Sequence, residues 1–274
     1  MPFTFFAHQL FVLPLKATWP RRFDGTALCL GSMAPDFAYA LSGTPLAVSG
    51  HTPLSLAYWT LPVSLVLTHI TRQHLATAVG RQLAPPYGTE IRVLAKTRHH
   101  WSVTWMSALV GGMTHIVVDA FTHPGSWAWN SFAFLRHSTL PGCSVADTLQ
   151  YLGHTLGTTV GVWWFAQLIH RGSLSAWSTA QRTPPVQPTR RDRAQLPAPQ
   201  SARSSSYLPI CSPGRGATRF WRGALSGTAF STLLGLTDFY FHRNLPTAII
   251  RASLYSLAFL WWLSLKARQA EPQA

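Results

Sequence analysis

The stretch "GGMTHIVVDAFTHPG", residues 111–125, places three polar side chains, His115, Asp119 and His123, in an otherwise apolar run. Side chains four positions apart lie on the same face of a helix, about one turn from each other. His115 and Asp119 could therefore bind one metal ion, as histidine pairs with this spacing do in zinc enzymes. A buried histidine–aspartate hydrogen bond between helices would produce the same spacing, so this stretch by itself leaves both interpretations open.

His123 continues the same helical face, but we expect it to lie beside the site rather than in its centre. On a straight helix it would lie about 12 Å along the axis from His115, at a rise of about 1.5 Å per residue. Pro124 and Gly125 predict that the helix ends at this point. We therefore expect His123 to orient metal ligands or to transfer a proton.

The composition favours a protein in contact with lipid. Hydrophobic residues make up 47% of the 274 residues and charged residues only 11%, whereas soluble domains carry about 25% charged residues. The stretches apolar enough to enter a bilayer are residues 53–70, 104–121, 152–169, 224–241 and 246–265. We expect an all-α, polytopic membrane bundle of about five transmembrane helices, preceded by short N-terminal helices.

The net charge of +14 could indicate nucleic-acid binding, but the distribution of the basic residues argues against it. Basic residues are frequent in 71–103, in 171–222 and at the C-terminus, and sparse in 121–151 and 242–245. This alternation follows the positive-inside rule for five crossings and places the basic segments in the cytoplasm. We expect a multi-pass protein of a bacterial inner (cytoplasmic) membrane, in contact with membrane lipid and not with nucleic acid.

The chain divides into four parts by composition. Residues 1–170 form the predicted membrane helical domain and contain most of the unusual polar residues. Residues 171–222 are rich in Pro, Arg and Ser, as in "TPPVQPTRRDRAQLPAPQSARSSS", and predict a disordered cytoplasmic linker. Contact of this linker with anionic lipid headgroups is the alternative. Residues 223–266 predict a transmembrane helical hairpin that turns at "HRNLP", and residues 267–274 form a tail.

The cysteines and the N-terminus limit the kinds of site and of targeting. Cys29, Cys143 and Cys211 lie far apart without a CxxC pair, which indicates neither a thiolate zinc site nor a disulfide framework. The apolar N-terminal stretch lacks a basic start and a small-residue cleavage site, so we interpret it as retained structure.

Tryptophans lie at the predicted ends of the membrane spans. Trp101 and Trp105, for example, lie at the start of the second apolar stretch. Such positions are typical of aromatic belts at membrane interfaces, and core packing is the alternative interpretation.

Three further polar residues lie in apolar surroundings in the first segment: His8, Asp36 and His51. Each has a simpler explanation when taken singly. Asp36 could cap a helix after Pro35, His51 could lie in a solvated loop, and His8 could be interfacial.

The predicted topology brings these residues to one side of the membrane. On the outer side lie His8, Asp36, His51, His115, Asp119, Gln150, His154, Asp238 and His242. Ionisable residues near a bilayer are costly and are candidates for function. Imidazoles with carboxylates are the ligands of zinc, iron or manganese. The sequence therefore predicts a metal site at the outer face.

Several blocks of the sequence resemble, in order, those of a bacterial family of integral membrane proteins of unknown function. They are "MPFTFFAHQLFVLPL", "GSMAPDFAYAL", "GHTPLSL", "GGMTHIVVDAFTHPG" and "LQYLGHTLG". This family is similar in motif order to membrane-bound metal-dependent hydrolases, and more distantly to zinc-dependent phospholipase C. The resemblance covers most of residues 1–170. Its first block departs from the family pattern, with Ala7 where a Ser is usual and Gln9 where a Pro is usual.

The resemblance implies five metal-ligand candidates, which are His8, Asp36, His51, His115 and Asp119. It implies a membrane-bound metal-dependent hydrolase, with Zn²⁺ as the expected metal, that cleaves a phosphoester or ester bond of a lipid with metal-activated water. His123 and His154 are the candidate catalytic residues. The alternative is a non-catalytic membrane protein whose His/Asp cluster is structural or binds metal without turnover. A transporter is a third hypothesis, which the lack of internal repeats disfavours.

Overall fold

The computed structural model describes residues 5–182, together with residues 225–226, 229, 251–252, 255–256, 258–259 and 262–263. Among these residues the regular secondary structure is helical apart from one short hairpin. Its strands, β1 (Ser138–Leu140) and β2 (Cys143–Ser144), pair antiparallel. The predicted all-α fold is therefore confirmed for this part of the chain.

The N-terminal segment forms short helices, as expected. Helix α1 spans Phe5–Thr18, α2 spans Gly25–Gly31 and the 3₁₀ helix η2 spans Asp36–Leu41. Helix α2 begins after Asp24, whose side chain accepts a hydrogen bond from the Ala27 backbone N–H. This is the usual role of an aspartate at a helix N-cap.

The remaining helices lie between residues 56 and 182. They are the π-helix η3 (Leu56–Thr60), α3 (Leu61–Ile70), the π-helix η4 (Thr71–Leu75), α4 (Ala76–Gln82), α5 (Tyr87–Lys96), α6 (Trp101–Thr122), α7 (Trp127–Ser131), the 3₁₀ helix η5 (Ala133–Arg136), α8 (Val145–Leu152), the π-helix η6 (Gly153–Gly157), α9 (Thr158–His170) and α10 (Ser173–Arg182).

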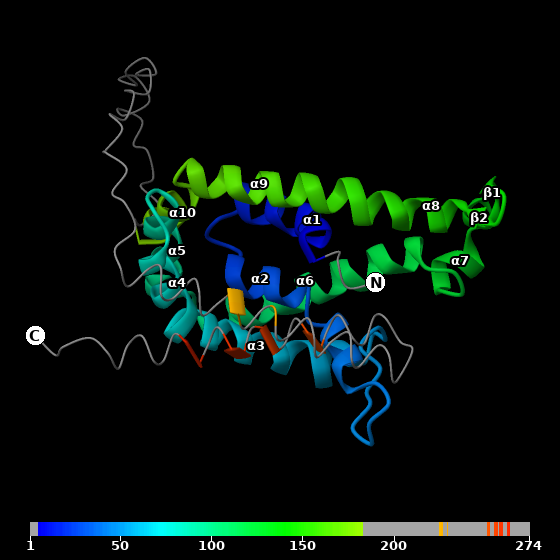
Figure 1. Ribbon diagram of the computed structural model, residues 1–274, viewed down its shortest axis with the longest axis horizontal. Helices are drawn as coiled ribbons and strands as arrows, with labels where there is room; N and C mark the ends of the chain where they lie inside the picture. Colours follow the sequence, from blue (N-terminus) through cyan, green and yellow to red (C-terminus); the bar gives the residue numbers. More distant parts are fainter. Residues whose placement is uncertain are drawn as a thin grey trace, which may run out of the picture.

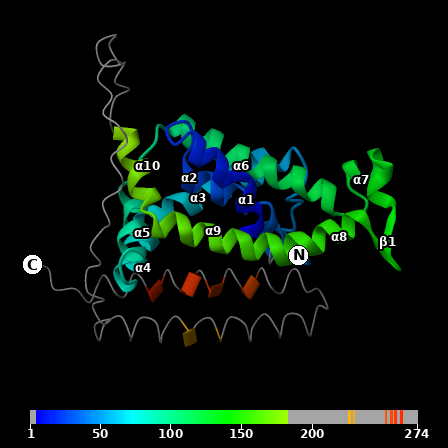
Figure 2. The ribbon, with the colours of Figure 1, turned by 90° about the horizontal axis from the view of Figure 1, so that it is seen from above.

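The helices are arranged along one long axis (Figures 1 and 2). Helix α6 lies along this axis, and α8 with α9 extends along it as well. Helices α4, α5 and α10 lie at one end of the bundle, while α7 and the β1–β2 hairpin lie at the other (Figure 1). The basic segment 71–103 and the poorly charged segment 121–151 therefore lie at opposite ends.

Only one of the predicted membrane spans is a long regular helix in the described part of the chain. Helix α6 contains the predicted span 104–121, and it alone among the described helices is long and apolar enough to cross a bilayer. Residues 53–70 and 152–169 are largely helical, but the π-helices η3 and η6 interrupt them. The predicted spans 224–241 and 246–265 lie largely outside the described residues. The structure thus supports one candidate span and not five.

The predicted linker 171–222 begins with an ordered helix, which is a correction to the expectation from composition. Helix α10 is anchored because Ser175 donates hydrogen bonds to the buried Glu90 and because the Lys16 ammonium lies 5.8 Å from the ring centre of Trp177. The rest of the linker and the tail 267–274 lie outside the described residues. So does most of the predicted hairpin 223–266, whose few described positions are helical.

Glycines allow two pairs of helices to approach closely. A Cβ atom at Gly111 on α6 would collide with the Leu28 carbonyl of α2, and Gly31 on α2 makes the reciprocal contact with α6. A Cβ at Gly161 on α9 would collide with the Phe6 carbonyl of α1. Small residues at such contacts let helix backbones pack against each other. The first contact holds α2 beside the polar residues of α6, and the second packs α1 against α9.

Candidate metal centre

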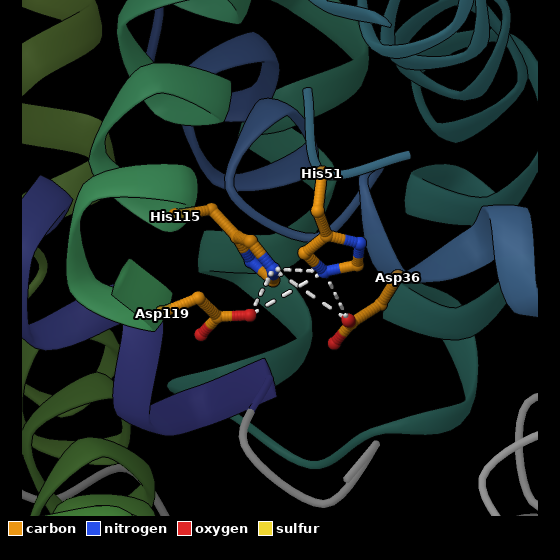
Figure 3. Close-up of side chains that lie close together, drawn as sticks. All are labelled: Asp36, His51, His115 and Asp119. Carbon is orange, nitrogen blue, oxygen red and sulfur yellow. Dashed lines mark hydrogen bonds and ion pairs between the residues drawn. The ribbon is translucent and has the colours of Figure 1, made fainter. Parts of the chain in front are cut away.

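Four side chains from three separate segments converge beside the second half of α6. They are Asp36 from η2, His51 from the loop before η3, and His115 and Asp119 from α6 (Figure 3). Each offers one ligand atom, and these four atoms lie within 4.8 Å of one another. We call this group the His/Asp cluster.

The spacing of the four atoms is that of ligands around one small cation. His115 Nε2 lies 3.2 Å from His51 Nε2, 3.2 Å from Asp119 Oδ2 and 3.5 Å from Asp36 Oδ1. His51 Nε2 lies 3.3 Å from both Asp36 Oδ1 and Asp119 Oδ2. A tetrahedral zinc site with ligand distances of about 2.0–2.1 Å has edges of roughly 3.3–3.4 Å. Five of the six edges of such a tetrahedron therefore have the expected length.

His115 is held in the orientation that a metal ligand needs. Its side chain is fully buried, and its Nδ1 lies 2.7 Å from the backbone carbonyl of Ser32. An Nδ1–H that donates to this carbonyl leaves the lone pair of Nε2 directed into the cluster, which is the usual second contact of a metal-binding histidine. The close approach of α2 and α6 at Gly31 and Gly111 places this carbonyl.

His8, the fifth predicted ligand, lies beside the other four. Its Nε2 is 3.6 Å from Asp119 Oδ1, and its ring stacks on that of His115 with the ring centres 4.0 Å apart. Burial and the neighbouring His115 lower the pKa of His8 to about 3, so its imidazole is neutral at neutral pH. The adjacent Gln9 donates to Ser32 Oγ at 3.0 Å and thereby ties α1 to the end of α2.

The charges of the cluster depend on one another. Burial raises the pKa of the Asp36 carboxyl, but His115 and a hydrogen bond with His51 outweigh it and hold the pKa below its usual range. Burial lowers the pKa of His51, but its hydrogen bonds with Asp119 and Asp36 outweigh this and raise it. The Asp36 carboxylate is therefore ionised at neutral pH, and protons compete with a metal ion for the imidazoles.

His123 lies beside the cluster at the C-terminal end of α6. Helix α6 ends at Thr122, and the His123 backbone is extended, with φ −120° and ψ 125°. The side chain folds back, so that Nδ1 lies 3.2 Å from the Asp119 backbone carbonyl and 4.0 Å from Asp119 Oδ1. These contacts are with Asp119, one helical turn before His123, so the side chain lies next to a cluster residue that is not His115.

Gln150 on α8 connects the two candidate catalytic histidines. Its side-chain amide lies 3.1 Å from His123 Nε2, and its backbone carbonyl lies 2.6 Å from His154 Nδ1. The Nε2 atom of His154 is buried and has no hydrogen-bond partner in the described part of the chain. The sequence placed Gln150 on the outer side but assigned it no role, because its contacts depend on how α8 packs against α6.

Two cavities reach the cluster. The first has a volume of about 430 Å³ and is lined by both carboxylates of the cluster, by His8, His123, Gln150 and His154, and by apolar residues such as Phe11, Val117 and Leu149. The second has a volume of about 310 Å³, and its lining includes Tyr39, His51, Asp119, His123 and Trp127. Asp119 and His123 line both cavities, so a ligand could reach the cluster from two sides.

Comparison with known proteins places the chain in a family. No curated protein and no solved structure matches it. Residues 1–201 match the family described as Domain of unknown function (DUF4184). This range covers most of the chain and includes every residue of the His/Asp cluster, together with His8, His123 and His154. The protein therefore belongs to the DUF4184 family.

Proposed function

We propose that this protein is a membrane-bound hydrolase that uses a Zn²⁺ ion in the His/Asp cluster to cleave a phosphoester or ester bond of a lipid. The main support for hydrolysis is the cavity of about 430 Å³ that both carboxylates of the cluster line, beside four atoms spaced to hold one ion. A structural zinc site is closed, whereas a catalytic one is accessible to water and substrate.

The residues of the chain have distinct roles in this proposal. Asp36, His51, His115 and Asp119 hold the ion, and the Ser32 carbonyl orients His115. When bound, a Zn²⁺ ion acts as a Lewis acid and lowers the pKa of water from 15.7 to about 7.

His154 is the residue that transfers a proton in this proposal. Its Nδ1–H donates to the Gln150 carbonyl, and its Nε2 has no hydrogen-bond partner among the described residues, so Nε2 can accept a proton or return it. His123, whose Nε2 contacts the Gln150 amide, is a positioning residue that packs against Asp119.

A lipid substrate fits the surroundings of the larger cavity. Phe11, Val117 and Leu149 line it, and between about two fifths and half of each is exposed, at 53%, 40% and 39%. In the membrane-bound protein that we propose, this exposed apolar surface faces acyl chains. A lipid tail could then enter the cavity from the bilayer while its headgroup reaches the carboxylates.

The alternative, a metal protein without turnover, is favoured by one observation. Four protein ligands fill a tetrahedral shell, as in structural zinc sites. The two functions differ in whether metal-loaded protein hydrolyses any substrate.

The test is a hydrolysis assay of the purified, zinc-loaded protein in detergent. The substrates are a long-chain phospholipid, a soluble chromogenic phosphodiester and a chromogenic carboxyl ester. We expect hydrolysis by the wild type, background rates for His115→Ala and Asp119→Ala, and wild-type rates for the control His137→Ala, which changes an exposed histidine outside the cluster. Stoichiometric zinc with no hydrolysis of any substrate would overturn the hydrolase and support the metal protein without turnover.

A further inference from the structure

We propose that a second site, near the first turns of α6, binds a phosphate group. It is a cavity of about 260 Å³ between the α3–η4 helical segment and the N-terminal end of α6. Its lining includes Thr68, His69, Arg72, Arg98, Trp101 and Thr104, and none of the described residues that line it is acidic. Thr104 lies about 16 Å along α6 from His115, at about 1.5 Å per residue. The site is therefore separate from the His/Asp cluster and does not depend on the proposed hydrolase.

Two buried donors that line this cavity lack a hydrogen-bond partner among the described residues. Thr68 and Arg72 are only 3% and 8% exposed, and neither Thr68 Oγ1 nor Arg72 Nε has a hydrogen-bond partner in the described part of the chain. A buried donor without a partner costs free energy, so such groups indicate a ligand that satisfies them. Both can donate to a phosphate oxygen.

The charge around the cavity is positive. Arg72 Nη2 donates to the buried Asp24 at 2.6 Å, which fixes the guanidinium and compensates its charge. Arg98 is exposed and forms no ion pair with a carboxylate of the described residues, so its charge is uncompensated. The N-terminus of the 22-residue α6 adds the positive end of a helix dipole. An anion with several acceptor oxygens fits this environment, and guanidinium groups bind phosphate well.

The position of the site suggests which phosphate compounds can reach it. Trp101 and Trp105 line the cavity and are exposed by 63% and 45%. Exposed tryptophans beside arginines are typical of the interface between lipid headgroups and acyl chains. The phosphate of an anionic phospholipid and free inorganic phosphate share the chemistry that this cavity recognises, and the experiment separates them.

The experiment uses the full-length protein and two probes. Inorganic phosphate is titrated against the protein in detergent and followed by thermal shift. For the second probe, the protein is placed in nanodiscs of phosphatidylcholine with or without phosphatidylglycerol. It is then released from the nanodiscs, and native mass spectrometry measures how much phosphatidylglycerol stays bound to it. The variants are Arg98→Gln and Thr68→Val, and the control is Arg92→Gln, which removes an exposed arginine of α5 that does not line the cavity.

We expect Arg98→Gln to weaken binding at least tenfold and Arg92→Gln to leave it unchanged. Thr68→Val should weaken binding while raising the melting temperature of the ligand-free protein, because it removes a buried hydroxyl without a partner. Selective retention of phosphatidylglycerol assigns the site to a lipid headgroup, and a response to inorganic phosphate alone assigns it to the free anion. Wild-type binding of both probes by Arg98→Gln and Thr68→Val, or an equal loss in Arg92→Gln, would overturn the proposal.

Discussion

Two groups of buried polar side chains lie beside α6, and they are neutralised in different ways. The first, which we call the Asp24 network, consists of Asp24, Arg72, Thr104 and Ser107. Asp24 Oδ1 accepts from Arg72 Nη2 at 2.6 Å, and Oδ2 accepts from Thr104 Oγ1 at 2.7 Å. The Asp24 backbone N–H donates to Ser107 Oγ at 2.8 Å. The chain itself supplies the cation and the hydrogen bonds that this carboxylate needs.

The second group is the His/Asp cluster, to which the described residues supply no lysine or arginine as a permanent cation. The ion pairs of Asp36 and Asp119 within the described residues are with histidines only. The negative charge of two buried carboxylates that face imidazole nitrogens is neutralised either by protons on the imidazoles or by a bound metal ion. We infer from this difference that the Asp24 network stabilises the fold, and the proposal for the His/Asp cluster is that it binds a cation from outside.

The largest expected effect is the loss of bound metal when one carboxylate of the cluster is neutralised. Asp119→Asn keeps the shape of the side chain but removes a negative ligand, so we expect the zinc content to fall from about one ion per chain to near zero. Elemental analysis of the purified protein measures it. Asp24→Asn is the matched control, and its folded fraction should keep about one zinc ion per chain. Equal metal loss in both variants would mean that the two groups do not differ as we infer.

The second largest effect is on folding stability, and here we expect it from a change in the Asp24 network. Arg72→Gln leaves the Asp24 carboxylate buried without its cation, which costs about 3–5 kcal/mol for buried pairs. Thermal or chemical unfolding in detergent measures this loss. Arg92→Gln, at an exposed position, should change stability by no more than about 0.5 kcal/mol. A loss below about 1 kcal/mol in Arg72→Gln would contradict the proposed role of the pair.

A smaller effect is expected on the pH dependence of stability. Burial raises the pKa of Asp24, but the Arg72 charge and the hydrogen bond from Thr104 outweigh it, so the pKa lies below its ordinary value of 3.8. Asp24 therefore stabilises the fold above its unfolded-state pKa of about 3.9, and this contribution is lost as the pH falls through the lower folded-state value. Unfolding measured between about pH 6 and pH 3 should have a shallower acid dependence in Asp24→Asn. An unchanged pH dependence of the unfolding free energy in Asp24→Asn would show that Asp24 does not make this contribution to stability.

The smallest effect concerns Gln150, which contacts both His123 and His154. Gln150→Leu removes the side-chain hydrogen bond to His123 Nε2 but leaves the backbone carbonyl that accepts from His154. A neutral hydrogen bond contributes about 0.5–1.5 kcal/mol. If this bond positions His123 for the reaction, its loss should lower the rate in the hydrolysis assay roughly 2- to 12-fold. Zinc content should stay unchanged, because Gln150 is not part of the cluster. Loss of zinc in this variant would instead assign Gln150 to the metal site.

The sequence predicted the parts of the site that depend on local spacing. The four-residue step from His115 to Asp119 in an apolar run predicted a shared helical face, and both side chains belong to the cluster. Asp36 and His51 were reached only through the predicted topology and the family resemblance, because no local pattern connects them to α6. The contact of the Ser32 carbonyl with His115 depends on the close approach of two helices, which no local pattern predicts.

The differences from prediction also have physical causes. The helix α10 was missed because the composition of residues 171–222, taken together, hid a short segment with Ser175 and Trp177 as anchors. The π-helices in the predicted spans 53–70 and 152–169 depend on packing against other helices, which hydropathy does not measure.

The most direct test of the account is zinc X-ray absorption spectroscopy on the purified, zinc-loaded protein, together with its metal stoichiometry. We predict one ion per chain, in a shell that includes two imidazole nitrogens and two carboxylate oxygens at about 2.0–2.2 Å and no sulfur. We also predict that this shell is absent from His51→Ala and His115→Ala. A protein that binds no zinc, iron or manganese, or a metal shell that is unchanged in those two variants, would contradict the account.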